Sequence, residues 1–208
     1  AISTASVQGL TTDLLNALSA EQVQALTVGQ VRSLTSDQIN NLNSDQLQAI
    51  DSIEIAALNT SVIAKISSDQ IALLSPSQVS ALTTVQTKAL SSDQISNLTT
   101  AQIQSLNTSG IASFSTAQMS AMSSDQLGAL TTSQVRFISG TALMSLTTEK
   151  MRGLGSDQVQ ALTLTQVKSL TPMQINNLNS SQLQALETNE IAALSTAIIA
   201  KINTDQIA

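Results

Sequence analysis

Apolar and polar residues recur along this chain with a period of eight. From Ser3 onward the sequence divides into 25 complete eight-residue units, here called octads, without insertion or deletion. Position 8 is apolar in all 25 octads, and position 5 is Val, Ile, Leu or Met in 24, with Thr87 as the exception. Position 1 is Ser, Thr, Asn or Asp in 23 octads, and position 4 is Gln or Glu in 18. Such regularity is typical of a repeat architecture.

Each octad predicts the start of a short α-helix. Ser or Thr followed three residues later by Gln or Glu is a capping box, and the apolar residues before the cap and at the fourth helical position form a hydrophobic staple. We expect capping boxes that pair Thr35 with Gln38, Ser67 with Gln70, Ser91 with Gln94, and Thr99 with Gln102. The corresponding staple and core residues are Leu34, Ile39, Leu42, Leu47, Leu98 and Ile103.

Proline and charge placement support this register. Pro76 and Pro172, the two prolines of the chain, both fall at position 2, the first helical residue, where proline is favoured. All 14 acidic residues lie at positions 1 to 4, whereas seven of the eight basic residues lie at positions 6 or 7. This distribution suits the helix dipole, and Lys150 at position 4 is the exception. The predicted fold is therefore an all-α solenoid of short capped helices, one per octad.

Two other structures compete with this solenoid. In one long helix an eight-residue repeat would turn the apolar stripe by roughly 80° each time, so no partner could bury it. A parallel β-solenoid remains the alternative fold, although positions 5 and 8 would point to opposite faces of a strand. Circular dichroism distinguishes the two, because a β-solenoid would give mostly strand.

The array is expected to form one continuous solenoid over residues 1–208. Two buried aliphatics per octad contribute about 4 kcal/mol, while ordering eight residues costs on the order of 10 kcal/mol, so octads must stack to be stable. The pattern leaves the number of octads per turn open. Residues 27–66 also match residues 163–202 at an offset of 136 residues, or 17 octads, which predicts that the complete octads from Ser3 to Ile202 belong to a longer array.

Composition removes most other classes of function. The chain has no His, Cys, Trp or Tyr, and its net charge is −6. Nucleic acid needs a basic face, so we expect no nucleic-acid partner. No apolar stretch approaches the ~18 residues of a membrane span, so we expect no insertion into a membrane. Ser and Thr lack an activating His or Cys, and Asp at position 3 is most simply a helix-start charge. We therefore expect no enzyme activity, no cofactor and no metal site.

The phrases TTAQIQSL, SSDQISNL and NSSQLQAL resemble the octapeptide short-helix repeats of long secreted bacterial surface proteins. The resemblance covers the whole chain through its repeat style and composition. It implies an extracellular or cell-surface location and a structural, adhesive or filament-forming role. The glycine-rich calcium-binding nonapeptides of many secreted proteins are absent.

Three functions are compatible with this pattern. The first is a structural one, in which octads extend a stalk, surface layer or filament and chains associate end to end or side to side. The second is a binding or adhesion module for a protein or glycan, for which position 6 is the most variable and Phe114 and Phe137 are the two aromatic residues. The third is an ice-binding array of the Thr residues at positions 1 and 2.

Overall fold

The computed structural model describes residues 3–199, and the final residues of the last octad lie outside this range. The described residues form short α-helices and no strand, which confirms the all-α solenoid prediction. Each helix has four to six residues, begins at position 2 of an octad and carries the number of that octad. The helices are α1 (Thr4–Gln8), α2 (Thr12–Asn16), α3 (Ala20–Gln24), α4 (Val28–Arg32), α5 (Ser36–Asn40), α6 (Ser44–Gln48), α7 (Ser52–Ala57), α8 (Thr60–Ile63), α9 (Ser68–Leu73), α10 (Pro76–Ser80), α11 (Thr84–Ala89), α12 (Ser92–Asn97), α13 (Thr100–Ser105), α14 (Thr108–Ala112), α15 (Thr116–Ala121), α16 (Ser124–Ala129), α17 (Thr132–Val135), α18 (Gly140–Met144), α19 (Thr148–Arg152), α20 (Ser156–Gln160), α21 (Leu164–Ser169), α22 (Pro172–Asn176), α23 (Ser180–Gln184), α24 (Thr188–Ala193) and α25 (Thr196–Ile199).

The helices begin where the octad pattern predicts. At Ser91, for example, the backbone is extended with φ −73° and ψ 163°, and the side chain accepts the Gln94 N–H, as an N-cap does. Pro76 and Pro172 each occupy the first turn of their helix. At this point proline needs no donor, because the first N–H groups of a helix have no partner within it.

The helices end without a left-handed residue. No residue of the described chain has a positive φ, glycine included. Instead the position 8 residue often leaves the helix in an extended conformation, as Leu98 does with φ −63° and ψ 136°. The next N-cap is also extended, as at Thr99. Two extended residues therefore separate such neighbouring helices, and the chain changes direction there.

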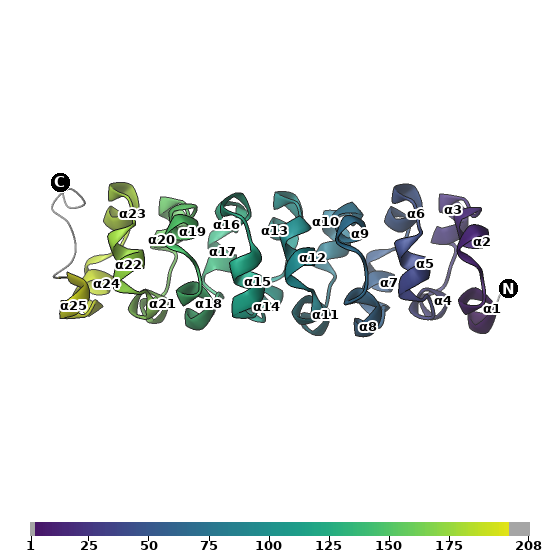
Figure 1. Cartoon of the computed structure of the whole chain (residues 1–208), viewed down its shortest axis with the longest axis horizontal. Coiled ribbons are helices and arrows are strands. Elements are labelled where there is room, and N and C mark those ends of the chain that lie inside the picture. The colour runs from purple at the N-terminus through teal and green to yellow at the C-terminus, as the bar shows by residue number, and fades with distance from the viewer. Residues whose placement is uncertain (1–2, 200–208) are drawn as a thin grey trace. The chain divides into compact units, whose positions relative to one another are not determined.

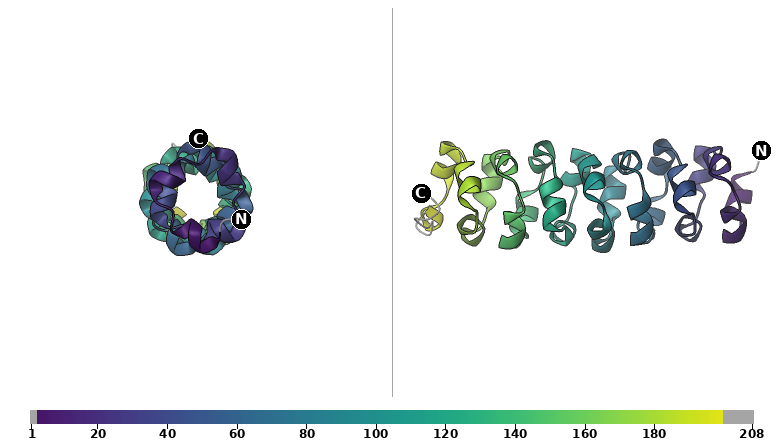
Figure 2. Two further views of the ribbon diagram at one scale, coloured as in Figure 1. Left: turned by 90° about the vertical axis from the view of Figure 1, so that its right-hand side faces the viewer. Right: turned by 90° about the horizontal axis from the view of Figure 1, so that it is seen from above.

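Two compact units make up the chain, Ala1–Gly110 and Ile111–Ala208, and we describe each by itself. Within both units a helix packs against the helix three octads further along the chain. The contacting pairs are α1 with α4, α2 with α5, α3 with α6, α4 with α7, α6 with α9, α7 with α10, α8 with α11, α9 with α12 and α10 with α13 in the first unit, and α15 with α18, α16 with α19, α17 with α20, α18 with α21, α19 with α22, α20 with α23, α21 with α24 and α22 with α25 in the second. Figure 1 and Figure 2 show this winding within each unit. The continuity of one solenoid over both units stays a prediction.

The core of each unit is aliphatic. Positions 5 and 8 are buried almost throughout, as at Ile95, Leu98, Val159 and Leu162, each with at most 3% of its surface exposed. An isolated helix of four to six residues is unstable in water. The helices therefore depend on stacking, because burial against neighbouring turns supplies the stabilisation that one octad lacks.

Candidate functional site

The most regular chemical feature of the structure is the position 4 glutamine, which connects consecutive turns. Gln94 is 2% exposed, and its Oε1 accepts the backbone N–H of Ser91 at 2.7 Å. Its Nε2 donates to the carbonyls of Ile63 and Ile66, at 2.8 and 2.7 Å. These two carbonyls lie at the end of the helix four octads earlier. A single side chain therefore completes the start of its own helix and satisfies the end of a helix in the previous turn.

The same bond recurs at a fixed separation in both units. Its acceptors always include the residue 28 positions earlier, and in most cases the residue 31 positions earlier. Among the described residues this bond is made, for example, by Gln38, Gln46, Gln70, Gln78, Gln86, Gln94 and Gln102 in the first unit and by Gln158, Gln166, Gln174 and Gln182 in the second. Since 28 residues are three and a half octads, one turn takes between three and four helices.

The capping boxes at three of the four predicted positions have both of their hydrogen bonds. The N-cap side chains of Thr35, Ser91 and Thr99 accept the N–H of the glutamine three residues later, at 3.1 to 3.2 Å. In return, each glutamine Oε1 accepts the backbone N–H of its N-cap residue, at 2.7 to 2.9 Å.

The predicted capping box at Ser67 and Gln70 forms only one of its two hydrogen bonds. Ser67 accepts the Gln70 N–H at 3.2 Å, but its own N–H donates to Oδ1 of Asn40 at 2.8 Å. Asn40 also donates through Nδ2 to the Lys65 carbonyl, which fixes its amide at this place. The Gln70 Oε1 is buried without a hydrogen-bond partner as a result. A side chain from the previous turn has thus replaced the local bond.

The six predicted staple and core residues are all buried. Their exposed fractions are 3% or less for Leu34, Ile39, Leu42, Leu47, Leu98 and Ile103. Leu34 and Leu42 precede an N-cap, while Ile39 and Leu47 follow it by four residues, as a staple requires. The direct contact within each staple pair stays a prediction.

Lys150, the one basic residue outside positions 6 and 7, is explained by its partner. The Lys150 ammonium donates to the carbonyl of Ser120, 30 residues earlier. Ser120 lies at the helix end to which a glutamine at position 150 would donate. Lysine has donors and no acceptor, so it can replace the turn-to-turn half of glutamine but not the capping half.

Two octads that lack glutamine use asparagine at position 1 instead. In the octad with Gly110 at position 4, the Asn107 Nδ2 donates to the Leu82 carbonyl at 3.0 Å, while its Oδ1 accepts the Gly110 N–H at 2.7 Å. In the octad with Val62 at position 4, the Asn59 Nδ2 donates to the Arg32 carbonyl at 3.2 Å. Both bonds reach the turn before, so these two octads keep a donor toward the previous turn although they lack the glutamine.

The octad predicts the capping half of the glutamine but not its connection between turns. The sequence carries one signal of that connection, because position 4 has Gln in 16 octads and Glu in two. A capping box accepts either residue. The strong preference for the amide indicates a second role that needs a donor, and carboxylates lack one.

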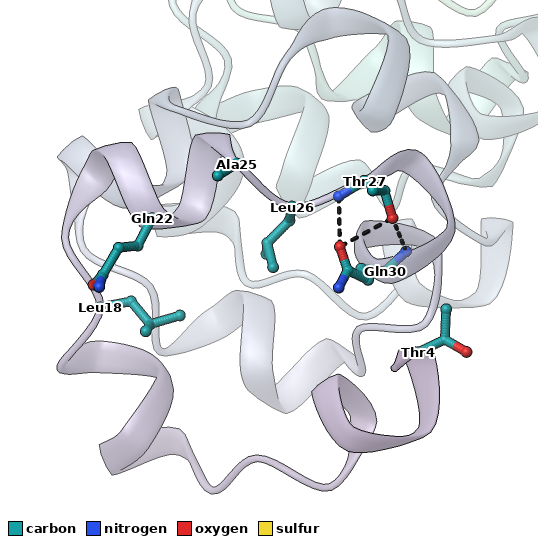
Figure 3. A pocket seen from close by; sticks show the side chains of 7 residues that line it. All are labelled: Thr4, Leu18, Gln22, Ala25, Leu26, Thr27 and Gln30. Carbon is teal, nitrogen blue, oxygen red and sulfur yellow. Dashed lines mark hydrogen bonds between the residues drawn. The ribbon is translucent and has the colours of Figure 1, made fainter. Parts of the chain in front are cut away.

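Each unit has a shallow hollow on its surface among the described residues. One, of about 420 Å³, lies in the first unit between Leu18, Gln22, Leu26 and Gln30, with the Thr27–Gln30 capping box at its edge (Figure 3). The other lies in the second unit beside Gly128, Gly155 and Asp157. Among the described residues no three acidic side chains gather into a possible metal site, and none of the helices is long and apolar enough to cross a membrane.

Short capped helices that stack turn on turn through side-chain amides define the chain as an all-α solenoid repeat protein. More particularly, it belongs to the ALTTAQ repeat family, whose model matches residues 47–84, 98–132 and 141–172, together half of the chain. The six letters of the family name correspond to positions 7, 8 and 1 to 4 of the octad, as in ALTTVQ at 81–86 and ALTTSQ at 129–134. No curated protein matches the sequence.

Proposed function

We propose that the chain is an extracellular structural protein that forms a stalk, surface layer or filament by stacking solenoid turns. One observation carries this proposal: the glutamine bond between turns recurs at the same separation in octad after octad. Since most octads offer the same donors and acceptors, turns can be added without new chemistry, as in other solenoids. The number of octads in the sequence then determines the length of the solenoid.

Composition supports a structural role over a catalytic one. The chain has no His or Cys, and hydroxyl groups at position 1, such as those of Ser91 and Thr99, serve as helix caps. We therefore also propose that the chain has no enzyme activity, holds no cofactor and does not bind nucleic acid. Self-association, end to end or side to side, is its main expected interaction.

Electron microscopy of the purified native protein tests the assembly. We expect fibres or ordered lattices, together with a sedimentation coefficient that rises with protein concentration. Dispersed monomers at all concentrations under native conditions would exclude filament formation by the chain itself. Fractionation of the source cells with an antibody to the chain tests the location, and recovery from the cytoplasm alone would contradict the extracellular part.

A binding module is the second candidate, and the exposed apolar side chains of the second unit support it. Phe137 and Leu164 are 27 residues apart, and Met144 and Met173 are 29 apart, so each pair is separated by about one turn. All four are exposed, with Met173 at 70% and Phe137 at 52%. Saturable binding of a defined protein or glycan that is lost in Phe137→Ala would favour this function over the structural one.

A further inference from the structure

Two octads have glutamate where the turn-to-turn glutamine is expected. Glu54 and Glu190 occupy position 4 of octads that correspond in the 136-residue repeat. Both side chains are buried, with 6% of their surface exposed. Oε2 of Glu54 accepts the Asp51 N–H at 3.1 Å, and Oε2 of Glu190 accepts the Glu187 N–H at 3.0 Å. The capping half of the interaction is therefore retained at both places.

By equivalence with the neighbouring glutamines, the other half of the interaction is directed at backbone carbonyls of the previous turn. In the neighbouring octad, Nε2 of Gln46 donates to the Leu18 carbonyl at 2.7 Å. The equivalent carbonyls, 28 residues before the two glutamates, belong to Leu26 and Leu162. A carboxylate offers acceptors only, whereas a neutral carboxyl group has one O–H donor. The bond to the previous turn can thus form only when the glutamate is protonated.

We propose that Glu54 is a pH-sensitive joint between turns of the solenoid. In the neutral form, the carboxyl O–H donates to the carbonyl of Leu26 and holds the two turns together. In the ionised form, two groups of acceptors face each other, and the turns separate more readily at this point. The inference depends on the winding of the helices and not on the proposed assembly or location.

The charged groups around Glu54 leave burial as the dominant influence on its pKa. Of the helices packed against α7, α4 carries Arg32 and α10 carries no charge, and the octad of Leu26 carries Glu21. Asp51 is the N-cap of α7 itself. Arg32, Glu21 and Asp51 are all exposed.

The pKa of Glu54 moves in the direction that the joint requires. Burial raises this pKa above the ordinary value of 4.5, the Asp51 N–H bond opposes the rise, and the Asp51 charge adds to it. Because the folded-state pKa is raised, the neutral group contributes stability that is fully present below about pH 4.5. That stability is lost as the pH rises through the folded-state pKa.

Hydrogen exchange of the full chain, followed by peptide mass spectrometry, tests the proposal. Protection factors for residues 51–58 are compared between the wild type and Glu54→Gln over a series from pH 5 to pH 8, which avoids precipitation near the pI of 4.3. The ratio of the two chains at each pH cancels effects of the other carboxylates. We expect Glu54→Gln to be increasingly better protected as the pH rises, by up to about tenfold for each unit by which the pKa is raised.

A further variant makes the result decisive. Gln46→Glu should create a new pH-dependent loss of protection at residues 43–50. A ratio that stays constant from pH 5 to pH 8 would overturn the proposal, because a merely structural difference between Glu and Gln would not titrate. The assembly state, measured separately by sedimentation, decides the proposed function independently.

Discussion

The side-chain amide of Gln78 donates to the backbone carbonyl of Ile50, 28 residues earlier, at 2.7 Å. The same amide donates to the Leu47 carbonyl at 2.8 Å, and its oxygen accepts the Ser75 N–H at 2.8 Å. Gln78 is 2% exposed, so water cannot replace these three bonds without opening the structure. One glutamine thereby sets the register between two turns.

Gln78→Ala should lower the free energy of unfolding by about 2 to 4 kcal/mol, because it removes the amide partner of the Ser75 N–H and of the Ile50 carbonyl and one of the two donors to the Leu47 carbonyl. Urea denaturation monitored by circular dichroism measures the change. Gln22→Ala is the matched control. Gln22 is exposed, accepts the Ser19 N–H at 2.9 Å, and bonds no other turn within the described chain. Its loss should cost about 1 kcal/mol, as for a helix cap. Equal costs at both sites would contradict the role of Gln78 between turns.

Local features of this structure were predictable from the octad alone. The cap at Thr35, the start of a helix at Pro76 and the burial of Ile39 each follow from residues within eight positions of one another. Such signals survive because every octad repeats them in the same register. The helical class follows from the same local rules, since capping boxes and N1 prolines have no function in a strand.

The size of a turn could not be predicted, because it depends on partners about 28 residues apart. The half-formed box at Ser67 illustrates the limit: its N–H bonds Asn40, 27 residues earlier, although the local sequence SSDQ matches that at Ser91. Packing of one turn on the next thus decides between two bonds that the octad itself makes equally available.

Lys150 offers a direct test of the donor role at position 4. Lys150→Met keeps the aliphatic length and removes the ammonium that bonds the Ser120 carbonyl. We expect a loss of about 1 kcal/mol in the free energy of unfolding. Lys150→Gln should instead match or exceed the wild type, since glutamine can also accept the Thr147 N–H and complete a capping box. If Lys150→Met left the stability unchanged, the ammonium would have no role between turns.

Gly128 is expected to resist substitution for a steric reason. A Cβ at this position would lie 2.9 Å from the Gly153 carbonyl oxygen, which is backbone and cannot rotate away. Gly128→Ala should therefore destabilise the second unit by about 1 to 3 kcal/mol. At Gly29 the nearest atom to such a Cβ is the Thr4 methyl carbon at 3.7 Å. Gly29→Ala should then stabilise by about 0.5 to 1 kcal/mol through helix propensity. Opposite signs in thermal unfolding support the close approach of the helices, and stabilisation by both would refute it.

Two isoleucines, one buried and one exposed, test which position of the octad forms the core. Ile95 at position 5 is fully buried, whereas Ile53 at position 3 is 74% exposed. Ile95→Ala should cost about 2 to 5 kcal/mol, because it removes buried methyl groups and leaves a cavity. Ile53→Ala should change the free energy of unfolding by no more than about 0.5 kcal/mol. Both are measured in the same urea titration. The octad register assigns these opposite outcomes to one residue type, so comparable losses at the two sites would show that position 5 does not form the core.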